Sequence, residues 1–317
     1  MADTLEEQDH DGHLGVREKR HMEVKSIATL VASREKQRFL ISVIFGFLGL
    51  LILVVWPLLV PSNYFIYIGT MIVLNSIGAI ALHLIIRMGQ MSLGQAAFLG
   101  IGAYTSAILT LRLGVPFPLA FILSGLFAAI FGALIGPIVL RLKGVYFVLV
   151  TFTFGEIMRL IFNEWTSLTG GPEGIDKIPT PFPSMITTDN FYYIALGTAI
   201  VCILFVVRLL KCPFGHAVDA IRESEVLAAA TGVPVVKYKL IVFVIACGLV
   251  GFQGCLQAHF VHYISPLAFE FSQSLNFVVI NVIGGMNSLI GPLIGTLFIV
   301  SLPEMLRGWV EYQYIIY

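Results

Sequence analysis

One stretch decides the fold class of this chain: Phe117-Pro-Leu-Ala-Phe-Ile-Leu-Ser-Gly-Leu-Phe-Ala-Ala-Ile-Phe-Gly-Ala-Leu-Ile-Gly-Pro-Ile-Val-Leu140. It contains no charged residue and a single hydroxyl side chain, Ser124. An α-helix rises about 1.5 Å per residue, so about 20 apolar residues cross the hydrocarbon core of a bilayer. The stretch therefore predicts a helix that spans a membrane.

Seven other apolar stretches of comparable length occur along the chain. Together they predict an all-α fold, a polytopic transmembrane helix bundle of about eight spans. We place the spans at residues 39–60, 64–86, 92–111, 117–140, 145–162, 191–210, 240–261 and 275–302.

Glycines mark two of these spans. Gly94, Gly100 and Gly102 give the third span a small-residue surface, which lets membrane helices approach closely. Gly284-Gly285 and Gly291-Pro292 interrupt the last span. Such interruptions are tolerated where neighbouring groups satisfy the freed backbone.

The composition supports a membrane protein. Of the 317 residues, 57% are hydrophobic and 12% are charged, and the mean hydropathy is +0.90. Soluble domains carry about 25% charged residues, so a soluble enzyme and a disordered chain are both excluded. Lys and Arg number 19, as do Asp and Glu, so no basic surplus indicates nucleic acid as a partner. Membrane lipids are the expected surroundings.

Basic residues are distributed unevenly over the connections. If the N-terminus is cytoplasmic, all 19 except Arg112, Arg159 and Lys177 lie on the cytoplasmic side, in agreement with the positive-inside rule. The expected parts are a cytoplasmic tail at 1–38, a transmembrane domain at 39–317, an external loop at 163–190 and a cytoplasmic loop at 211–239.

The chain shows no catalytic apparatus. It contains no Gly-Lys dipeptide, which a P-loop requires, and no H-E-x-x-H or G-x-S-x-G motif. Its four cysteines form no Cys-x-x-Cys pair. We therefore predict that this chain is not itself an enzyme and holds no metal and no cofactor.

The most informative part of the cytoplasmic loop is Asp219-Ala-Ile-Arg-Glu-Ser-Glu-Val-Leu-Ala-Ala-Ala-Thr-Gly232-Val-Pro234. We predict one helix of about three turns, which Asp219 caps and which Gly232 ends in a left-handed conformation. Its apolar stripe contains Ile221, Val226, Leu227 and Ala230. The stripe lies either against the protein's own cytoplasmic face or in a groove of a partner.

Three further stretches belong with this segment. They are Gly89-Gln-Met-Ser-Leu-Gly-Gln-Ala-Ala-Phe-Leu-Gly-Ile-Gly-Ala-Tyr104, Thr153-Phe-Gly-Glu-Ile-Met-Arg-Leu-Ile-Phe-Asn163 with Leu168-Thr-Gly-Gly-Pro-Glu-Gly-Ile175, and Val282-Ile-Gly-Gly-Met-Asn-Ser-Leu-Ile-Gly-Pro-Leu-Ile-Gly295. With the pattern Glu225-x-x-Ala-Ala-Ala-x-Gly232, they resemble the M-type permease subunit of high-affinity branched-chain amino acid importers of the ABC class. The resemblance covers about residues 40–310.

The resemblance implies a location and a set of partners. The location is the bacterial inner membrane. The partners are a homologous permease subunit, two ABC ATPase subunits that hold ATP and Mg²⁺, a periplasmic or lipid-anchored substrate-binding protein, and the amino acid substrate. An E-A-A…G segment docks on the ATPase in this family, which implies coupling roles for Arg222, Glu223, Glu225, Ala228, Ala229 and Gly232.

The chain departs from the family's pattern at three points. Its N-terminal tail is longer than usual, and Asn287 stands where the family commonly has Gly. The family usually continues through another apolar span, whereas the given sequence ends at Tyr317. The resemblance therefore implies one or more further spans beyond that residue.

Polar groups inside the spans are candidates for a substrate pathway. A charge at membrane depth costs about 2.5–3.5 kcal/mol on insertion scales, so Glu156 and Arg159, three residues apart, are expected to pair. The pair either forms a gate or stabilises the bundle. The uncharged candidates Gln90, Ser92, Gln95 and Asn281 either replace the hydration of an amino acid or bond helices together.

The external loop contains Thr169-Gly-Gly-Pro-Glu-Gly174. Because glycines adopt backbone angles that other residues resist, we predict a tight turn here. The turn is either a docking surface for the binding protein, through Gly170, Gly171 and Glu173, or a plain solvent turn.

Three alternatives stand beside the leading hypothesis. A permease of the same family could carry urea, a short amide or a sugar. An ion-coupled secondary transporter would need ionisable residues free in the spans, and beyond Glu156 and Arg159 the chain offers few. An integral membrane enzyme would need a nucleophile–base or metal constellation, which the sequence does not show.

Overall fold

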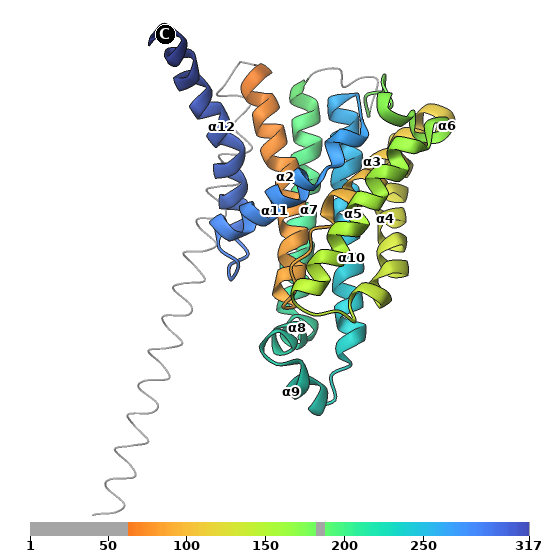
Figure 1. Ribbon diagram of the computed structural model, residues 1–317, viewed down its shortest axis with the longest axis vertical. Helices are drawn as coiled ribbons and strands as arrows, with labels where there is room; N and C mark the ends of the chain where they lie inside the picture. Colours follow the sequence, from red (N-terminus) through yellow and green to blue (C-terminus); the bar gives the residue numbers. More distant parts are fainter. Residues whose placement is uncertain (1–62, 182–187, 317) are drawn as a thin grey trace, which may run out of the picture. The chain divides into compact units, whose positions relative to one another are not determined.

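The computed structural model describes residues 63–181 and 188–316 (Figure 1). Within these residues the regular elements are helices, and one isolated antiparallel bridge pairs Ile175 with Ile264. The all-α fold predicted from the sequence is confirmed. The expected tail at 1–38 and the expected span at 39–60 lie outside the described residues.

Six predicted spans correspond to six helices. These are α2 (Asn63–Arg87), α3 (Gln95–Arg112), α4 (Phe117–Val139), α5 (Val145–Glu164), α7 (Thr188–Lys211) and α10 (Val235–Val261). All but α3 are long and apolar enough to cross a membrane, and with the segment Pro266–Gly284 they make six such segments in the described part of the chain. Small and hydroxyl residues lower the apolar character of α3, most of which is buried. The chain is thus a multi-pass membrane protein.

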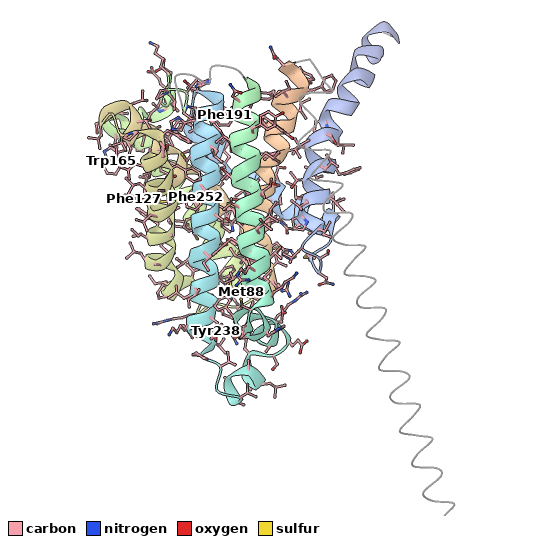
Figure 2. All side chains as sticks on the ribbon, turned by 180° about the vertical axis from the view of Figure 1, so that it is seen from behind. Met88, Phe127, Trp165, Phe191, Tyr238 and Phe252 are labelled. Carbon is pink, nitrogen blue, oxygen red and sulfur yellow. The ribbon has the colours of Figure 1, made fainter. Side chains whose placement is uncertain are left out.

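α10 forms the centre of this bundle, because it packs against α2, α3 and α4. A Cβ added at Gly102 of α3 would lie 2.2 Å from the carbonyl oxygen of Gly251 on α10, so the two backbones are in direct contact. The small-residue surface predicted on α3 therefore packs on α10. Towards α4, Phe252, which Figure 2 labels on α10, stacks on Phe121 with the ring centroids 4.7 Å apart.

The last predicted span, 275–302, is divided into two helices, and the interruption predicted at its glycines is confirmed. α11 (Phe271–Gly284) ends at a turn in which Gly285 has a φ of +101°, and α12 (Gly291–Ile316) begins after that turn. A Cβ at Gly284 would lie 1.9 Å from the carbonyl oxygen of Gly291, so only glycine allows this approach. The chain therefore turns where the sequence indicated an interruption, and α11 lies inclined to the upright α2 (Figure 1).

Short helical segments occur at both ends of the bundle. α8 (Pro213–Glu223) and α9 (Glu225–Ala230) come just before α10. α6 (Thr166–Thr169) and η1 (Gly171–Glu173) follow α5, and the bridge pairs the residues after η1 with those between α10 and η2 (Pro266–Phe269). α8 and α9 adjoin the start of α10, whereas α6 and η1 lie near its end. The two pairs of short segments therefore lie at opposite ends of the bundle (Figure 1).

Candidate functional site

The cytoplasmic helix that the sequence predicted over 219–232 is two helices. α8 ends at Glu223 and α9 begins at Glu225, because the backbone of Ser224 is extended, with φ −160° and ψ 112°. The hydroxyl oxygen of Ser224 accepts a hydrogen bond from the backbone N–H of Leu227 at 3.3 Å. Ser224 therefore caps α9, and a capping side chain favours this break over a continuous helix.

Asp219 lies within α8, so its predicted role as a helix cap is wrong. Its two carboxylate oxygens accept hydrogen bonds from Nε and Nη2 of Arg87, at 2.6 and 2.8 Å. This bidentate pair fastens α8 to the end of α2. The hydrogen bonds from Arg87 lower the pKa of Asp219 below its ordinary value of 3.8.

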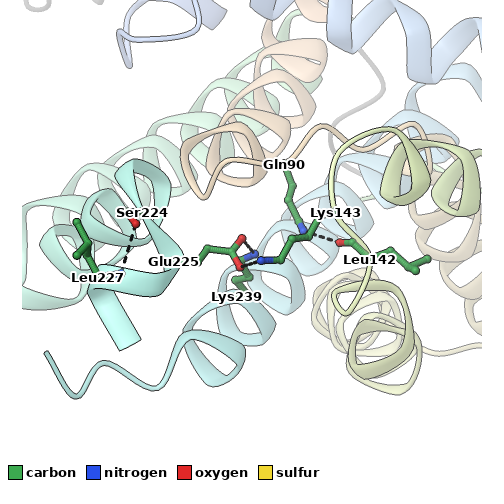
Figure 3. A network of polar contacts seen from close by, with 7 residues as sticks. All are labelled: Gln90, Leu142, Lys143, Ser224, Glu225, Leu227 and Lys239. Carbon is green, nitrogen blue, oxygen red and sulfur yellow. Dashed lines mark hydrogen bonds and ion pairs between the residues drawn. The ribbon is translucent and has the colours of Figure 1, made fainter. Parts of the chain in front are cut away.

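The Glu225 side chain forms ion pairs within its own chain. Its Oε2 lies 2.8 Å from Nζ of Lys143 in the connection between α4 and α5, and its Oε1 pairs with Nζ of Lys239 on α10 (Figure 3). The Lys239 side chain is 3% exposed. Burial alone would raise the pKa of Glu225, but the hydrogen bonds from Lys143 and Lys239 outweigh it and lower that pKa.

The other predicted coupling residues differ in their surroundings. Arg222 donates a hydrogen bond from Nη2 to Oδ1 of Asn287 at 2.7 Å, which joins α8 to the turn between α11 and α12. Ala228 is buried, whereas Glu223, Ala229 and Gly232 are exposed. Gly232 has a φ of +89°, so the left-handed end predicted for this segment is confirmed. The coupling role of these residues stays a prediction.

Two exposed apolar residues show that the stripe predicted from the sequence is not continuous. Val226 is 76% and Leu227 is 68% exposed, although the predicted stripe grouped them with the buried Ile221. Apolar residues spaced at the helical period share one face only along an unbroken helix. The break at Ser224 therefore ends the apolar stripe. The signal was Ser224 itself, because Ser before a short apolar helical run is typical of an N-cap. We call Val226 and Leu227 the apolar tip.

Acid is expected to loosen α8 and α9 from the bundle. Asp219 and Glu225 have pKa values below their ordinary 3.8 and 4.5, so their ion pairs stabilise the fold above those values. This contribution to stability is lost as the pH falls through the pKa values that the two carboxyl groups have in the folded protein, which are the lower ones. Hydrogen exchange of residues 213–230, corrected for intrinsic rates, should stay constant from about pH 6 to 8 and rise below about pH 4. Exchange in the wild type that does not change with pH would contradict this.

Two of the six predicted pathway residues bond directly to each other. Glu156 and Arg159 pair on α5, with Oε2 and Nε 2.9 Å apart, so the predicted pairing is confirmed. Their side chains are 31% and 25% exposed. Asn281 on α11 donates a hydrogen bond from Nδ2 to the carbonyl oxygen of Ala79 at 3.0 Å, which joins α11 to α2.

Of the three candidates near the start of α3, Gln90 and Ser92 form hydrogen bonds. Gln90 donates from Nε2 to the carbonyl oxygen of Leu142 at 3.0 Å, and the hydroxyl oxygen of Ser92 accepts from the backbone N–H of Gly94 at 3.2 Å. Gln95 is 1% exposed, and neither of its amide atoms has a hydrogen-bond partner within the described residues. An unpaired buried polar group costs about 1–3 kcal/mol, so Gln95 stays the uncharged candidate that most needs a polar ligand.

The turn at Thr169–Gly174, which the sequence predicts to be external, has the tight geometry predicted for it. Gly170 and Gly171 have φ values of +78° and +61°, and a Cβ at Gly170 would lie 2.0 Å from the carbonyl oxygen of Gly174. Glu173 is exposed, and its carbonyl oxygen accepts a hydrogen bond from the hydroxyl of Tyr263 at 3.0 Å. The turn is therefore fixed to the residues that follow α10. Its role in docking a binding protein stays a prediction.

Metal ligands do not gather in the described part of the chain. No group of three His, Cys, Asp or Glu residues there is placed to hold an ion. The expectation that this chain holds no cofactor stays a prediction.

Comparison with known proteins places the chain in a family. A family model described as the branched-chain amino acid transport system permease component matches residues 64–317. The chain is similar to the high-affinity branched-chain amino acid transport system permease protein LivM of Salmonella typhimurium and of Escherichia coli. The identity is 33% over 291 residues, and the alignment covers 83% of this chain and 68% of each relative.

A more distant relative is the autoinducer 2 import system permease protein LsrD of Salmonella paratyphi A. It is 26% identical over 273 residues, which cover 80% of this chain and 79% of the relative. No solved structure matches the chain significantly. Because the family match runs from α2 to α12, the chain belongs to the family of permease components of branched-chain amino acid transport systems.

Proposed function

We propose that this chain is the transmembrane permease subunit of an ABC importer that carries branched-chain amino acids across the bacterial inner membrane. The family match and the LivM relatives support this assignment. The structural observation that carries it is the cytoplasmic segment α8–α9. Ion pairs from α2, α10 and the α4–α5 connection fix this segment to the bundle, while its apolar tip is exposed.

The apolar tip is the proposed contact for an ATPase subunit. Val226 and Leu227 are neighbours in a short helix at the cytoplasmic end of the bundle, and both are more than two-thirds exposed. Apolar side chains on a helix bind a partner by entering a groove. One ATPase subunit would bind here and a second would bind the homologous permease, and these two subunits would hold the ATP and Mg²⁺.

The exposed charges of α5 support a pathway between two permease subunits. Glu156 and Arg159 are 31% and 25% exposed, yet the neighbouring Ile157 and Leu160 are each 50% exposed. Charges that face lipid are costly, so this face of α5 is better covered by protein or by a hydrated path. We place the homologous permease against this face. The binding protein would deliver the amino acid at the external turn.

Transport by the complete importer tests this proposal. The chain, purified with its native partners and placed in vesicles, should take up leucine, isoleucine and valine only with ATP and the binding protein present. Mass spectrometry of the purified complex should find a second permease and an ATPase. Urea, acetamide and ribose should not compete. Uptake driven by an ion gradient without ATP would overturn the proposal in favour of a secondary transporter.

Replacing Glu173 with Gln is expected to weaken docking of the binding protein. The concentration of binding protein that gives half-maximal uptake should rise about 2- to 5-fold, as for the loss of one charge at the rim of an interface. The turn should persist, because its bond to Tyr263 uses the backbone carbonyl. Gly171→Ala is a poorer probe, since its Cβ would lie 2.7 Å from Cγ2 of Thr166.

Asp176→Asn is the matched control for this change, because Asp176 is a second exposed acid of the same loop. It should leave the half-maximal concentration unchanged. If Glu173→Gln also leaves it unchanged, the turn is a plain connector.

A further inference from the structure

The connection between α4 and α5 is bonded from two sides (Figure 3). Gln90, between α2 and α3, donates a hydrogen bond to the carbonyl oxygen of Leu142 at 3.0 Å. On the next residue, Nζ of Lys143 lies 2.8 Å from the Glu225 carboxylate of α9. Three segments far apart in the sequence therefore meet at this connection.

Glu225 divides its carboxylate between two lysines in very different surroundings. The Lys239 side chain is 3% exposed, whereas the Lys143 side chain is 69% exposed. A buried ammonium without its carboxylate partner strongly destabilises the folded protein. The ion pair between Glu225 and Lys239 is therefore permanent. An exposed ion pair is worth about 0.2–1 kcal/mol because water replaces it readily, so the contact with Lys143 can open and close.

Only one residue, Gly144, separates Lys143 from the first residue of α5. Gly144 has a φ of +56°, a left-handed conformation that favours glycine, and a Cβ there would meet nothing within 4 Å. α5 begins at the next residue and carries the Glu156–Arg159 pair. A displacement of Lys143 therefore acts on the first turn of α5, the helix that bears the intramembrane charges.

We propose that Glu225 is a positioning residue that transmits movement of α8 and α9 to α5 through Lys143, and that it is not a contact for the ATPase. This inference rests on the proposed importer function. The apolar tip would receive the ATPase, the Lys239 contact would keep Glu225 attached to α10, and the Lys143 contact would pass the displacement on. Gln90 would hold the same connection from the side of α3.

Three variants of the complete importer in vesicles test this proposal. In Lys143→Met the ratio of amino acid transported to ATP hydrolysed should fall about 2- to 5-fold, which corresponds to the loss of an exposed ion pair. Lys143→Arg keeps the charge and should restore the ratio. Arg141→Met is the matched control, because Arg141 is an exposed cation of the same connection that forms no ion pair within the described residues.

Two measurements separate transmission from docking and from structural support. The amount of ATPase that co-purifies should be the same for wild type and Lys143→Met, and a loss of ATPase would make this pair a docking contact and overturn the proposal. Hydrogen exchange of residues 140–150 should rise in Lys143→Met, and this readout does not depend on transport. Unchanged exchange or an unchanged transport ratio would overturn the inference even if the wild type imports normally. No ATP-driven uptake by the wild type would instead overturn the proposed function, and the inference with it.

Discussion

Replacing Gly254 with Val is expected to remove the folded protein from the membrane. A Cβ at this position of α10 would lie 2.1 Å from the carbonyl oxygen of Leu99 and 2.9 Å from the backbone nitrogen of Ala103. These are backbone atoms of α3, so no side-chain rotation can relieve the overlap, and the two helices would have to separate. Inserted core atoms already cost about 1–3 kcal/mol where side chains can shift, and the cost here should exceed that.

The yield of monodisperse protein in mild detergent, together with its midpoint of thermal unfolding, measures this effect. Gly197→Val is the matched control, because Gly197 lies in α7 and a Cβ there would meet nothing within 4 Å. It should be recovered at wild-type levels. Recovery of Gly254→Val at the same level would show that α3 and α10 do not pack as described.

Replacing both residues of the apolar tip with Ser is expected to detach the ATPase. Val226 and Leu227 are exposed, so their loss should leave the fold of the permease intact. Buried apolar anchors at the centre of an interface contribute about 2 kcal/mol or more, so affinity for the ATPase should fall roughly 30-fold or more. ATP-driven uptake should then be lost.

Co-purification of the ATPase and uptake in vesicles measure this second effect. Leu113→Ser is the control, because Leu113 is also 68% exposed but lies in the connection between α3 and α4, at the opposite end of α3 from α8 and α9. It should retain the ATPase. If the Val226→Ser, Leu227→Ser protein also retains it, the apolar tip is not the docking contact.

We propose two roles within α9 because its side chains point in different directions. The apolar tip points away from the bundle, whereas Glu225 points into it. The resemblance to importer permeases treated this segment as one docking motif, and nothing in the spacing of the residues separated its members. The separation depends on the break at Ser224, which turns α9 relative to α8. A capping hydrogen bond worth about 1 kcal/mol therefore helps to set which residues of α9 face away from the bundle.

Neighbouring residues were enough to predict the membrane class, most of the spans and the left-handed glycines. In lipid each backbone N–H and C=O must be satisfied within its own helix, so an uncharged stretch such as 117–140 specifies a spanning helix without reference to the rest of the chain. The observed α4 (Phe117–Val139) agrees with that stretch to within one residue. The positive φ of Gly170 and Gly232 likewise follows from local turn and cap geometry.

Only the tertiary structure decided which side chains meet. Arg87 binds Asp219 across 132 residues, Asn281 donates to Ala79 across 202, and Glu225 binds Lys143 on another segment. The turn that divides 275–302 into α11 and α12 likewise depends on contact between Gly284 and Gly291. Hydropathy sets how deep a helix lies but not how it is rotated about its axis. That rotation is chosen by close packing at glycines and by ion pairs at the helix ends, and it exists only when all the helices are assembled.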